Sequence, residues 1–316
     1  MERSSNVGTN DSSPRPVVAA VDFSASSDLA LSWAMTIARA HRARLHLVHA
    51  VSRTLPMLSR HDVRSPLAEA SIGKAGLHLE ELAESIRSPD QPVECHLLHD
   101  RPSVAILKVA DWERAGLIVM GTRGEGGVQD LMMGSTNERV TTGAACPVLS
   151  VGPDSKEGSL LPRDVLVATD FSIEADAAAI AAQEMFGIEK HEVSVLLVSV
   201  LHTPAGLETD IAASRIWGQY VAECRALLKE RLAVLSGTFS LGKASARELL
   251  REGLPAAEIV RVATQEEVEV IAIGRRGSFA AGHEFLGSVA KRVIQTARCP
   301  VLSVPSLFSK RMRGRV

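Results

Sequence analysis

Two glycine-rich segments of the chain have the spacing of a phosphate-binding loop. Each reads G-x-x-G, then nine residues, then G-S: Gly121, Gly124, Gly134 and Ser135 in the first, and Gly274, Gly277, Gly287 and Ser288 in the second. The first glycine ends an apolar run, and the final Gly-Ser opens a segment with helical spacing. A helix amino terminus presents backbone N–H groups and the positive end of its dipole, and glycine lets the backbone approach an anion closely. The spacing predicts one phosphate site in each segment.

Charged residues accompany both glycine segments. Asp22 and Asp170 each follow an apolar run far upstream of a glycine segment, and a carboxylate there would accept ribose hydroxyls or help to hold Mg²⁺. Three arginines between the paired glycines are predicted to supply positive charge to a triphosphate: Arg123, Arg275 and Arg276. The alternative is a glycine turn that serves strand–helix packing, which the recurrence of the whole pattern disfavours.

The two glycine segments belong to an internal duplication. VVAAVDFS, from Val17, returns as VLVATDFS from Val165, and CPVLSV, from Cys146, returns from Cys299. We therefore expect a domain at 16–152 and another at 163–305, joined by a linker at 153–162 that is rich in turn formers. Residues 1–15 are expected to be a disordered tail, and 306–316 a basic one.

Short apolar runs alternate with helical patterns in each copy. In the first, strands are expected at 16–22, 44–50, 93–98, 117–121 and 148–151, with helices at 27–41, 66–87, 103–110 and 134–142. This alternation predicts an α/β fold of two tandem doubly wound domains, each with a parallel sheet and a ligand beyond the carboxyl ends of its strands. The last strand, PVLSV, is expected at a sheet edge, paired with its equivalent in the other copy as an intrachain pseudo-dimer. Pairing of two chains into a homodimer stays open.

From Pro16 to Val304 the sequence resembles the universal stress protein family, in its ATP-binding branch, through these glycine spacings. The resemblance implies a five-stranded parallel sheet in each domain, in order 3-2-1-4-5 with helices on both faces, and ATP bound in each domain. It implies adenine and ribose contacts in the first domain at Ala20, Val21, Asp22, Ala50 and Met120, and phosphate contacts at Gly121, Arg123, Gly124, Gly134, Ser135, Thr136 and Asn137. The matching second set is Ala168, Thr169, Asp170, Val200, Ile273, Gly274, Arg276, Gly277, Gly287, Ser288, Val289 and Ala290.

The first copy departs from the family pattern before its third helix. Family members usually have glycine there, as Gly253 is in EGLP, whereas the first copy has Asp100 in HDRP. An acidic side chain near the mouth of the site would weaken anion binding, so the second site is expected to be somewhat stronger. Neither copy has the S-G-G-x-D-S loop of nucleotidylyl-transferring relatives, which argues against synthetase chemistry.

We therefore expect a cytoplasmic, ATP-binding stress-response protein that acts as a nucleotide-dependent regulator or interaction module. No Glu, Gln or His recurs at matching loop positions as a general base, so we expect no catalytic residues and at most slow ATP hydrolysis. Two alternatives stay open: a nucleotide-independent scaffold with one or both sites empty, and a weak ATPase or cyclic-nucleotide-responsive regulator. The sequence does not distinguish a preference for ATP, AMP or cyclic AMP.

Composition narrows the class of protein. Lys plus Arg (35) nearly balances Asp plus Glu (37), so no basic footprint predicts a nucleic-acid partner. No stretch resembles a secretory signal or a membrane span, and four widely spaced cysteines favour the reducing cytoplasm. Protein partners are expected but not identified.

Histidines and cysteines are the remaining candidates for metal or redox sites. His46, His49, His96 and His99 lie on two strands of the first copy, where residues three apart face opposite sides, so at most one from each pair shares a face. With no equivalent in the second copy, we expect no metal site there, and His49 near the nucleotide. Cys146 and Cys299 are interpreted as small packing residues, with a redox switch as the alternative.

Overall fold

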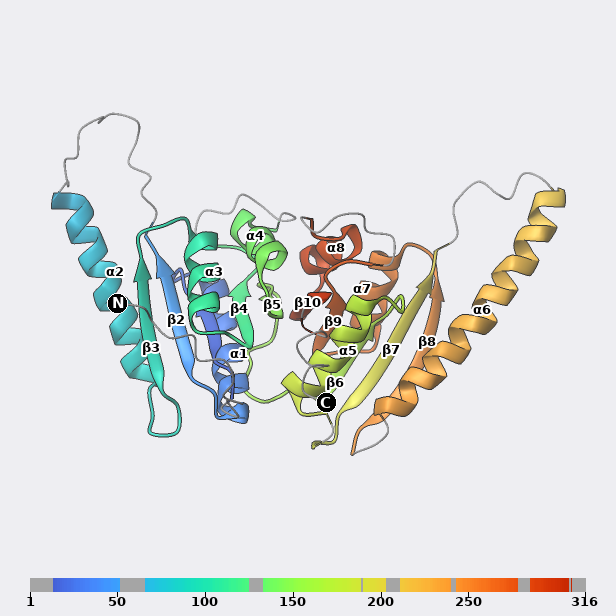
Figure 1. Cartoon of the computed structure of the whole chain (residues 1–316), viewed down its shortest axis with the longest axis horizontal. Coiled ribbons are helices and arrows are strands. Elements are labelled where there is room, and N and C mark those ends of the chain that lie inside the picture. Colours follow the sequence, from blue (N-terminus) through green and yellow to red (C-terminus); the bar gives the residue numbers. More distant parts are fainter. Residues whose placement is uncertain are drawn as a thin grey trace, which may run out of the picture.

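The computed structural model describes residues 14–51, 66–124, 133–188, 190–202, 211–239, 243–277, 285–306 and 308. Most of the expected terminal tails, and the middle of both glycine segments (125–132 and 278–284), lie outside the described residues. The described part forms two similar halves side by side, with a long helix at each outer end (Figure 1).

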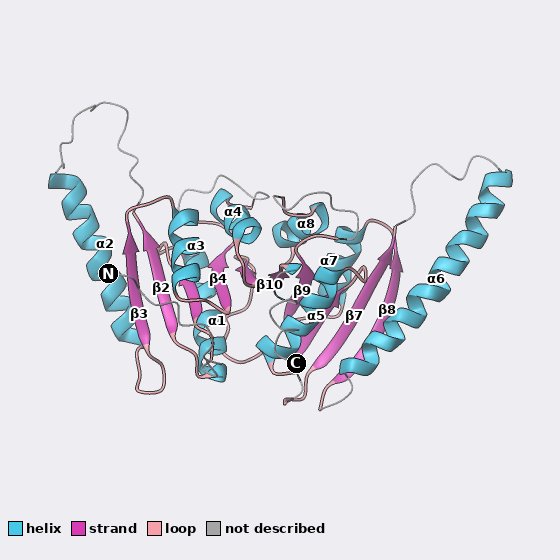
Figure 2. Cartoon of the chain, viewed as in Figure 1, coloured by secondary structure: helices cyan, strands magenta, loops and turns pink. Residues whose placement is uncertain are grey.

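Strands and helices alternate in both halves, as the sequence predicts (Figure 2). The first half contains β1 (Val17–Ala20), α1 (Ala25–His41), β2 (Leu45–Ala50), α2 (Pro66–Ile86), β3 (Val93–Leu98), α3 (Pro102–Trp112), β4 (Leu117–Gly121), α4 (Ser135–Gly143) and β5 (Val148–Val151). The second half contains β6 (Asp164–Ala168), α5 (Ile173–Phe186), β7 (Ser194–Leu201), α6 (Ile211–Phe239), β8 (Ser245–Glu252), α7 (Pro255–Gln265), β9 (Val270–Gly274), α8 (Ser288–Thr296) and β10 (Val301–Val304).

The strands of both halves join in one ten-stranded sheet, in the order β3-β2-β1-β4-β5-β10-β9-β6-β7-β8. Each half therefore has the expected order 3-2-1-4-5, with its strand order reversing between the first and fourth strands. The halves meet through β5 and β10, which pair antiparallel with Leu302 opposite Leu149. The expected pairing of the PVLSV edge strands is thus confirmed, and it satisfies backbone groups that an exposed edge would leave open.

Aliphatic side chains fill both faces of the sheet. One face packs against α1, α2, α5 and α6 in a core that is continuous across the halves. The other face carries α3 and α4 in the first half and α7 and α8 in the second. Within the described residues, no helix has both the length and the apolar character needed to cross a lipid bilayer.

The segment between the halves is docked on the first half. The Trp33 indole donates to the Lys156 carbonyl at 3.0 Å, and the Gly158 amide donates to Ser32 Oγ at 2.9 Å. A Cβ at Gly158 would lie 2.7 Å from Trp33 Cα and Cγ, so only glycine lets the backbone approach α1 this closely.

Gly158→Ala is therefore expected to destabilise the protein by about 1–3 kcal/mol through overpacking. Chemical denaturation would measure the change in free energy of unfolding. Gly237, exposed in α6 with nothing within 4 Å of an added Cβ, provides the matched control. Gly237→Ala should stabilise by about 0.5–1 kcal/mol, because alanine favours a helix interior over glycine. A Gly158→Ala variant as stable as the unmodified protein would contradict the close packing of the linker.

Candidate functional site

The candidate site in each half is built where the first strand ends. Asp22 follows β1, and Phe23 then adopts a left-handed conformation (φ 62°); Phe171 does the same after Asp170 (φ 60°). Such a backbone is strained for a bulky side chain, and its recurrence shows that both halves need the same sharp turn. Ser24 completes the turn in the first half, donating from Oγ to Asp22 Oδ1 at 2.6 Å and capping α1.

The turn places each aspartate against the second glycine of its own loop. A Cβ added to Gly277 would lie 2.7 Å from Asp170 Oδ2, and one added to Gly124 would overlap Asp22 Oδ2. Loop and carboxylate meet because β1 lies beside β4, and β6 beside β9, so their carboxyl ends share one edge. The sequence predicted this proximity, and the structure has it in both halves.

The helix after each glycine segment begins at that same edge. Gly134 is the N-cap of α4 and Gly287 that of α8, and neither helix has a side-chain hydrogen bond at its cap among the described residues. Ser135 and Ser288 follow and are exposed. The first amides of a helix have no partner within it, so each helix presents N–H donors toward an anion at this edge.

The remaining predicted residues gather around these features. Val21 and Thr169 adjoin the aspartates, and Thr136, Val289 and Ala290 lie in the first turns of α4 and α8. The other predicted residues lie at the carboxyl ends of strands: Ala20, Ala50, Met120 and Gly121 in the first half, and Ala168, Val200, Ile273 and Gly274 in the second. The Asn137 side chain is buried: it donates to the Gly121 carbonyl at 3.0 Å and accepts from Ser150 at 3.1 Å. Only the backbone of Asn137 is therefore left to contact a phosphate.

The two halves differ at the loop arginine. Arg276 donates from its guanidinium to Glu174 at 2.6 and 3.0 Å, and its backbone amide donates to the same carboxylate at 2.6 Å. Both side chains are nearly buried, at 12% and 9% exposure. Ser26 occupies the position of Glu174 in the first half, and its Oγ is buried with no hydrogen-bond partner in the described part of the chain. Glu174 was not predicted as a site residue from the sequence, although alignment of the two copies places it opposite Ser26.

Arg275 does not lie in a phosphate site, and this prediction was wrong. Its side chain is buried and crosses to the first half, where it donates to the Thr142 and Ala144 carbonyls at 2.7 and 2.6 Å. Burial lowers the pKa of Arg275 to about 10, so the guanidinium is still cationic at neutral pH. Consecutive loop residues point in different directions, and Arg275 points toward the carboxyl end of α4.

A family model for the universal stress protein family matches residues 14–152 and again 162–305. The chain belongs to the universal stress protein family. It is a tandem member with the family's stress-response role. A Mycolicibacterium smegmatis universal stress protein is 28% identical over 293 residues, which cover 91% of this chain and 96% of the relative.

Other relatives match one half or the whole. A Thermus aquaticus universal stress protein is 37% identical over 139 residues, 43% of this chain and 98% of the relative. The crystal structure of an Archaeoglobus fulgidus universal stress protein superposes with a TM-score of 0.66 at 23% identity, covering 93% of this chain and 99% of that one. This last similarity shows a shared fold across both halves.

In this universal stress protein, the negative charge of Asp100, which replaces the glycine usual in the family, is balanced by a neighbouring lysine. Lys108 donates to its carboxylate at 2.7 Å, and this hydrogen bond lowers the pKa of Asp100. Gly253, its counterpart in the second half, has a φ angle of 136°, which residues other than glycine rarely adopt. The structure thus weakens the reason for expecting the second site to be stronger, and the Glu174 contact supports the reverse order.

The histidines follow the predicted alternation. His49 donates from Nδ1 to the Val21 carbonyl at 2.7 Å, and its ring lies against Phe23 beside the first site. His46 and His96 share the opposite face, with His46 Nδ1 2.9 Å from His96 Nε2. Burial lowers the pKa of His46, although Glu113 and Glu94 partly oppose that shift. From the sequence, no metal site was predicted for His46 and His96.

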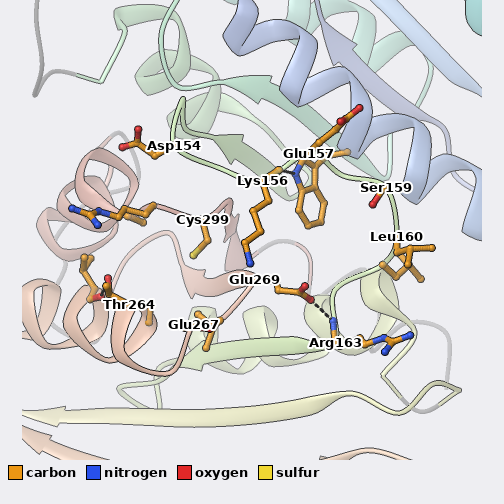
Figure 3. Close-up of a pocket in the computed structure, with 17 residues that line it drawn as sticks. Asp154, Lys156, Glu157, Ser159, Leu160, Arg163, Thr264, Glu267, Glu269 and Cys299 are labelled. Atoms are coloured by element: carbon orange, nitrogen blue, oxygen red, sulfur yellow. Dashed lines mark hydrogen bonds between the residues drawn. The ribbon is translucent and has the colours of Figure 1, made fainter.

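A cavity of about 470 Å³ lies away from both glycine loops, at the amino ends of the second half's strands. Linker residues and the segments before β9 and β10 enclose it, with Arg163 N donating to Glu269 at 2.6 Å (Figure 3). Cys299 lines it, and burial raises the pKa of this thiol to about 12. A thiol that stays protonated fits the packing role predicted for Cys299 and disfavours a redox switch.

Proposed function

We propose that this universal stress protein binds ATP beside its glycine loops and responds through a change of surface that partner proteins read. One observation carries the proposal: in both halves, a strand-end aspartate lies against a loop glycine at the edge where an uncapped helix begins. The presence of this arrangement in both halves is hard to explain by packing alone, because packing needs neither the aspartate nor a helix terminus without a side-chain cap.

ATP fits the residues at this edge. Its phosphates would accept from the first amides of α4 and from Arg123, and its ribose hydroxyls would donate to Asp22, which would also help to hold Mg²⁺. A side chain at Gly124 would fill the space between loop and carboxylate. With no general base repeated between the loops, turnover of the bound nucleotide would be slow.

The two sites are proposed to be unequal. In the second half, Glu174 already accepts from the loop amide and guanidinium of Arg276, in the place where phosphate oxygens would accept. In the first half, neutral Ser26 stands there. The first half would therefore hold ATP more tightly. The compartment we propose is the cytoplasm, which the four cysteines fit because none of them forms a disulfide.

Protein purified under native conditions and then denatured is expected to release adenine nucleotide, or, if stripped, to bind ATP by calorimetry. Gly134→Val should abolish binding in the first half, because a branched side chain at this N-cap occupies the phosphate position and crowds the Thr122 carbonyl, 3.2 Å from an added Cβ. Gly218→Val, in open space on α6, is the control and should bind as the unmodified protein does. Lack of both co-purified nucleotide and ATP binding would leave a nucleotide-independent scaffold as the function.

A further inference from the structure

Two histidines and a glutamate form a compact cluster on the first half, separate from the glycine loop. His46 lies on β2, His96 on the edge strand β3, and Glu113 at the C-cap of α3. Taking one nitrogen or oxygen from each, the three atoms lie within 4.8 Å of one another. His46 is the second residue of β2, so the cluster lies toward the amino ends of the strands, whereas the proposed nucleotide edge lies at their carboxyl ends.

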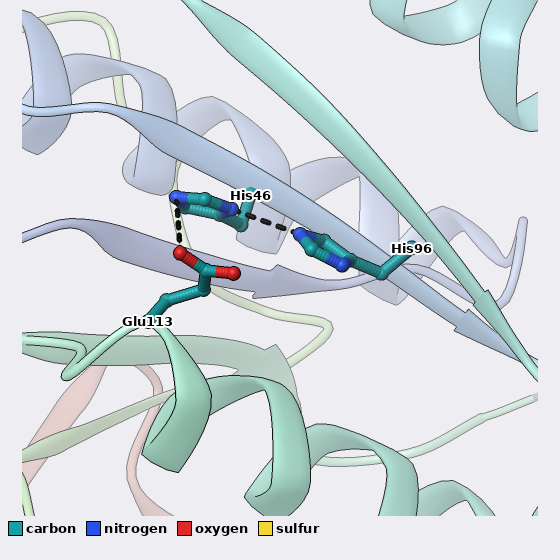
Figure 4. Close-up of side chains that lie close together, drawn as sticks. All are labelled: His46, His96 and Glu113. Atoms are coloured by element: carbon teal, nitrogen blue, oxygen red, sulfur yellow. Dashed lines mark hydrogen bonds and ion pairs between the residues drawn. The ribbon is translucent and has the colours of Figure 1, made fainter. Parts of the chain in front are cut away.

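The central histidine is incompletely satisfied. His46 lies between His96 and Glu113 (Figure 4) and is completely buried. Its Nδ1 contacts His96 Nε2 at 2.9 Å, but its Nε2 has no hydrogen-bond partner among the residues that the structure describes and faces Glu113 Oε2 at 3.9 Å. A buried nitrogen without a partner is costly and uncommon, and an absent ion is one of its ordinary explanations.

The second half is an internal control for this cluster. In the first half, Val18 pairs with His46 and Val48 pairs with His96. At the equivalent positions of the second half, Leu166 pairs with Leu196 and Val198 pairs with Leu249. The strand registers therefore equate His46 with Leu196 and His96 with Leu249. The two leucines belong to the aliphatic core of that half. The same backbone positions therefore hold an apolar contact in one half and two imidazoles in the other.

The charged residues around these positions also differ between the halves. Glu266, the counterpart of Glu113, is ion-paired with Arg247 in the second half. The counterpart of Arg247 in the first half is Glu94, whose Oε2 lies 3.9 Å from His46 Nδ1. In place of one closed ion pair, the first half has two carboxylates near the two histidines. Glu94 is also paired with Arg44, 3.5 Å away at the exposed surface, so the carboxylate that would bind a cation is that of Glu113.

We propose that His46, His96 and Glu113 bind a divalent transition-metal ion of the Zn²⁺ class. Imidazole and carboxylate are zinc ligands, and three protein ligands leave a fourth position for water. With Zn–N and Zn–O bonds of about 2.0–2.2 Å, ligand atoms lie roughly 3.3–3.6 Å apart. An imidazole binds an ion through one nitrogen, and for His46 we assign Nε2, which faces Glu113. The three residues offer ligand atoms within 4.8 Å of one another, and these reach the required spacing when the hydrogen bond between His46 Nδ1 and His96 Nε2 opens and the side chains of His96 and Glu113 turn toward that nitrogen. Glu94 adds negative charge beside the ion.

The test uses the full chain, stripped of metal and nucleotide and titrated with Zn²⁺ by calorimetry. One Zn²⁺ per chain is expected, with a rise in melting temperature, because the ion binds the folded state. His96→Leu, which introduces the residue of the second half, should weaken binding at least about tenfold, the loss that even an outer-shell partner of a ligand causes. His99→Leu, an exposed histidine three residues away, should leave affinity unchanged.

Glu113→Gln provides a second variant that keeps shape and removes charge. It should weaken Zn²⁺ binding and alter the visible absorption of a Co²⁺-loaded sample, while the melting temperature without metal stays near that of the unmodified protein. The proposal is overturned if the unmodified chain binds no Zn²⁺ at stoichiometric concentration. It is equally overturned if His99→Leu weakens binding as much as His96→Leu does, since the ion would then be held by surface histidines.

Discussion

The full-length protein is expected to bind one ATP tightly, and the Glu174→Ser variant is expected to bind two. Glu174 accepts three hydrogen bonds from Arg276 in a nearly buried setting, so a phosphate entering the second loop meets a negative charge that already uses these donors. Because Arg276 balances the charge of Glu174, the cost to a phosphate is mainly the loss of charge-assisted hydrogen bonds from the loop, each worth about 1.5–3 kcal/mol. The second site should therefore be weaker by on the order of 10- to 100-fold.

The reciprocal change tests the same physics in the other half. Ser26→Glu would put a carboxylate beside Gly121, where an added Cβ already lies 2.5 Å from Ser26 Oγ, and should weaken the first site by on the order of 100-fold. Ser26→Ala, which adds no charge, is the control and should retain binding. Isothermal titration calorimetry measures how many ATP molecules bind and how tightly. Repeating the titration with Gly134→Val or Gly287→Val isolates the second or the first half.

The outcomes separate the inequality of the sites from nucleotide binding itself. Two equal sites in the unmodified protein, or no gain in Glu174→Ser, would show that Glu174 does not compete with phosphate. Absence of ATP binding in every variant would instead reject the nucleotide-binding proposal as a whole.

Replacing Arg275 with leucine is expected to destabilise the protein by about 3 kcal/mol, because two carbonyls at the end of α4 lose a charged donor while buried. A loss of this size corresponds to a melting temperature lower by roughly 5–10 °C. Arg275 also joins the two halves, so its loss should reduce their cooperativity on unfolding. Differential scanning calorimetry would report both quantities.

An exposed ion pair across the same junction gives the matched comparison. Lys291 pairs with Glu138, and both side chains are more than a third exposed. Lys291→Met should therefore cost less than about 1 kcal/mol, as exposed pairs do. If Arg275→Leu shifted the melting temperature no more than Lys291→Met, the buried guanidinium would not be what holds α4 to the second half.

Alternation along the strands accounts for the predictions that the structure confirms. A period of two places His46 and His96 on one face and His49 on the other, and the shared carboxyl edge of parallel strands brings Asp22 to Gly124. These relations depend on local repeat geometry, which residue spacing encodes. The pairing of β5 with β10 was predictable for a related reason, since a short apolar edge strand needs a partner.

Residue type and spacing along the chain thus determined the duplication, the alternation of strands and helices and the position of both glycine loops, and the family resemblance added the sheet order. Only the tertiary structure decided what each loop side chain contacts: Arg276 turns to Glu174, Arg275 crosses to the other half, and Asn137 is buried beneath its loop. Strand and helix periods repeat over a few residues, so sequence reveals them. The partner of a loop side chain comes from segments as far as 133 positions away, and packing in three dimensions selects it.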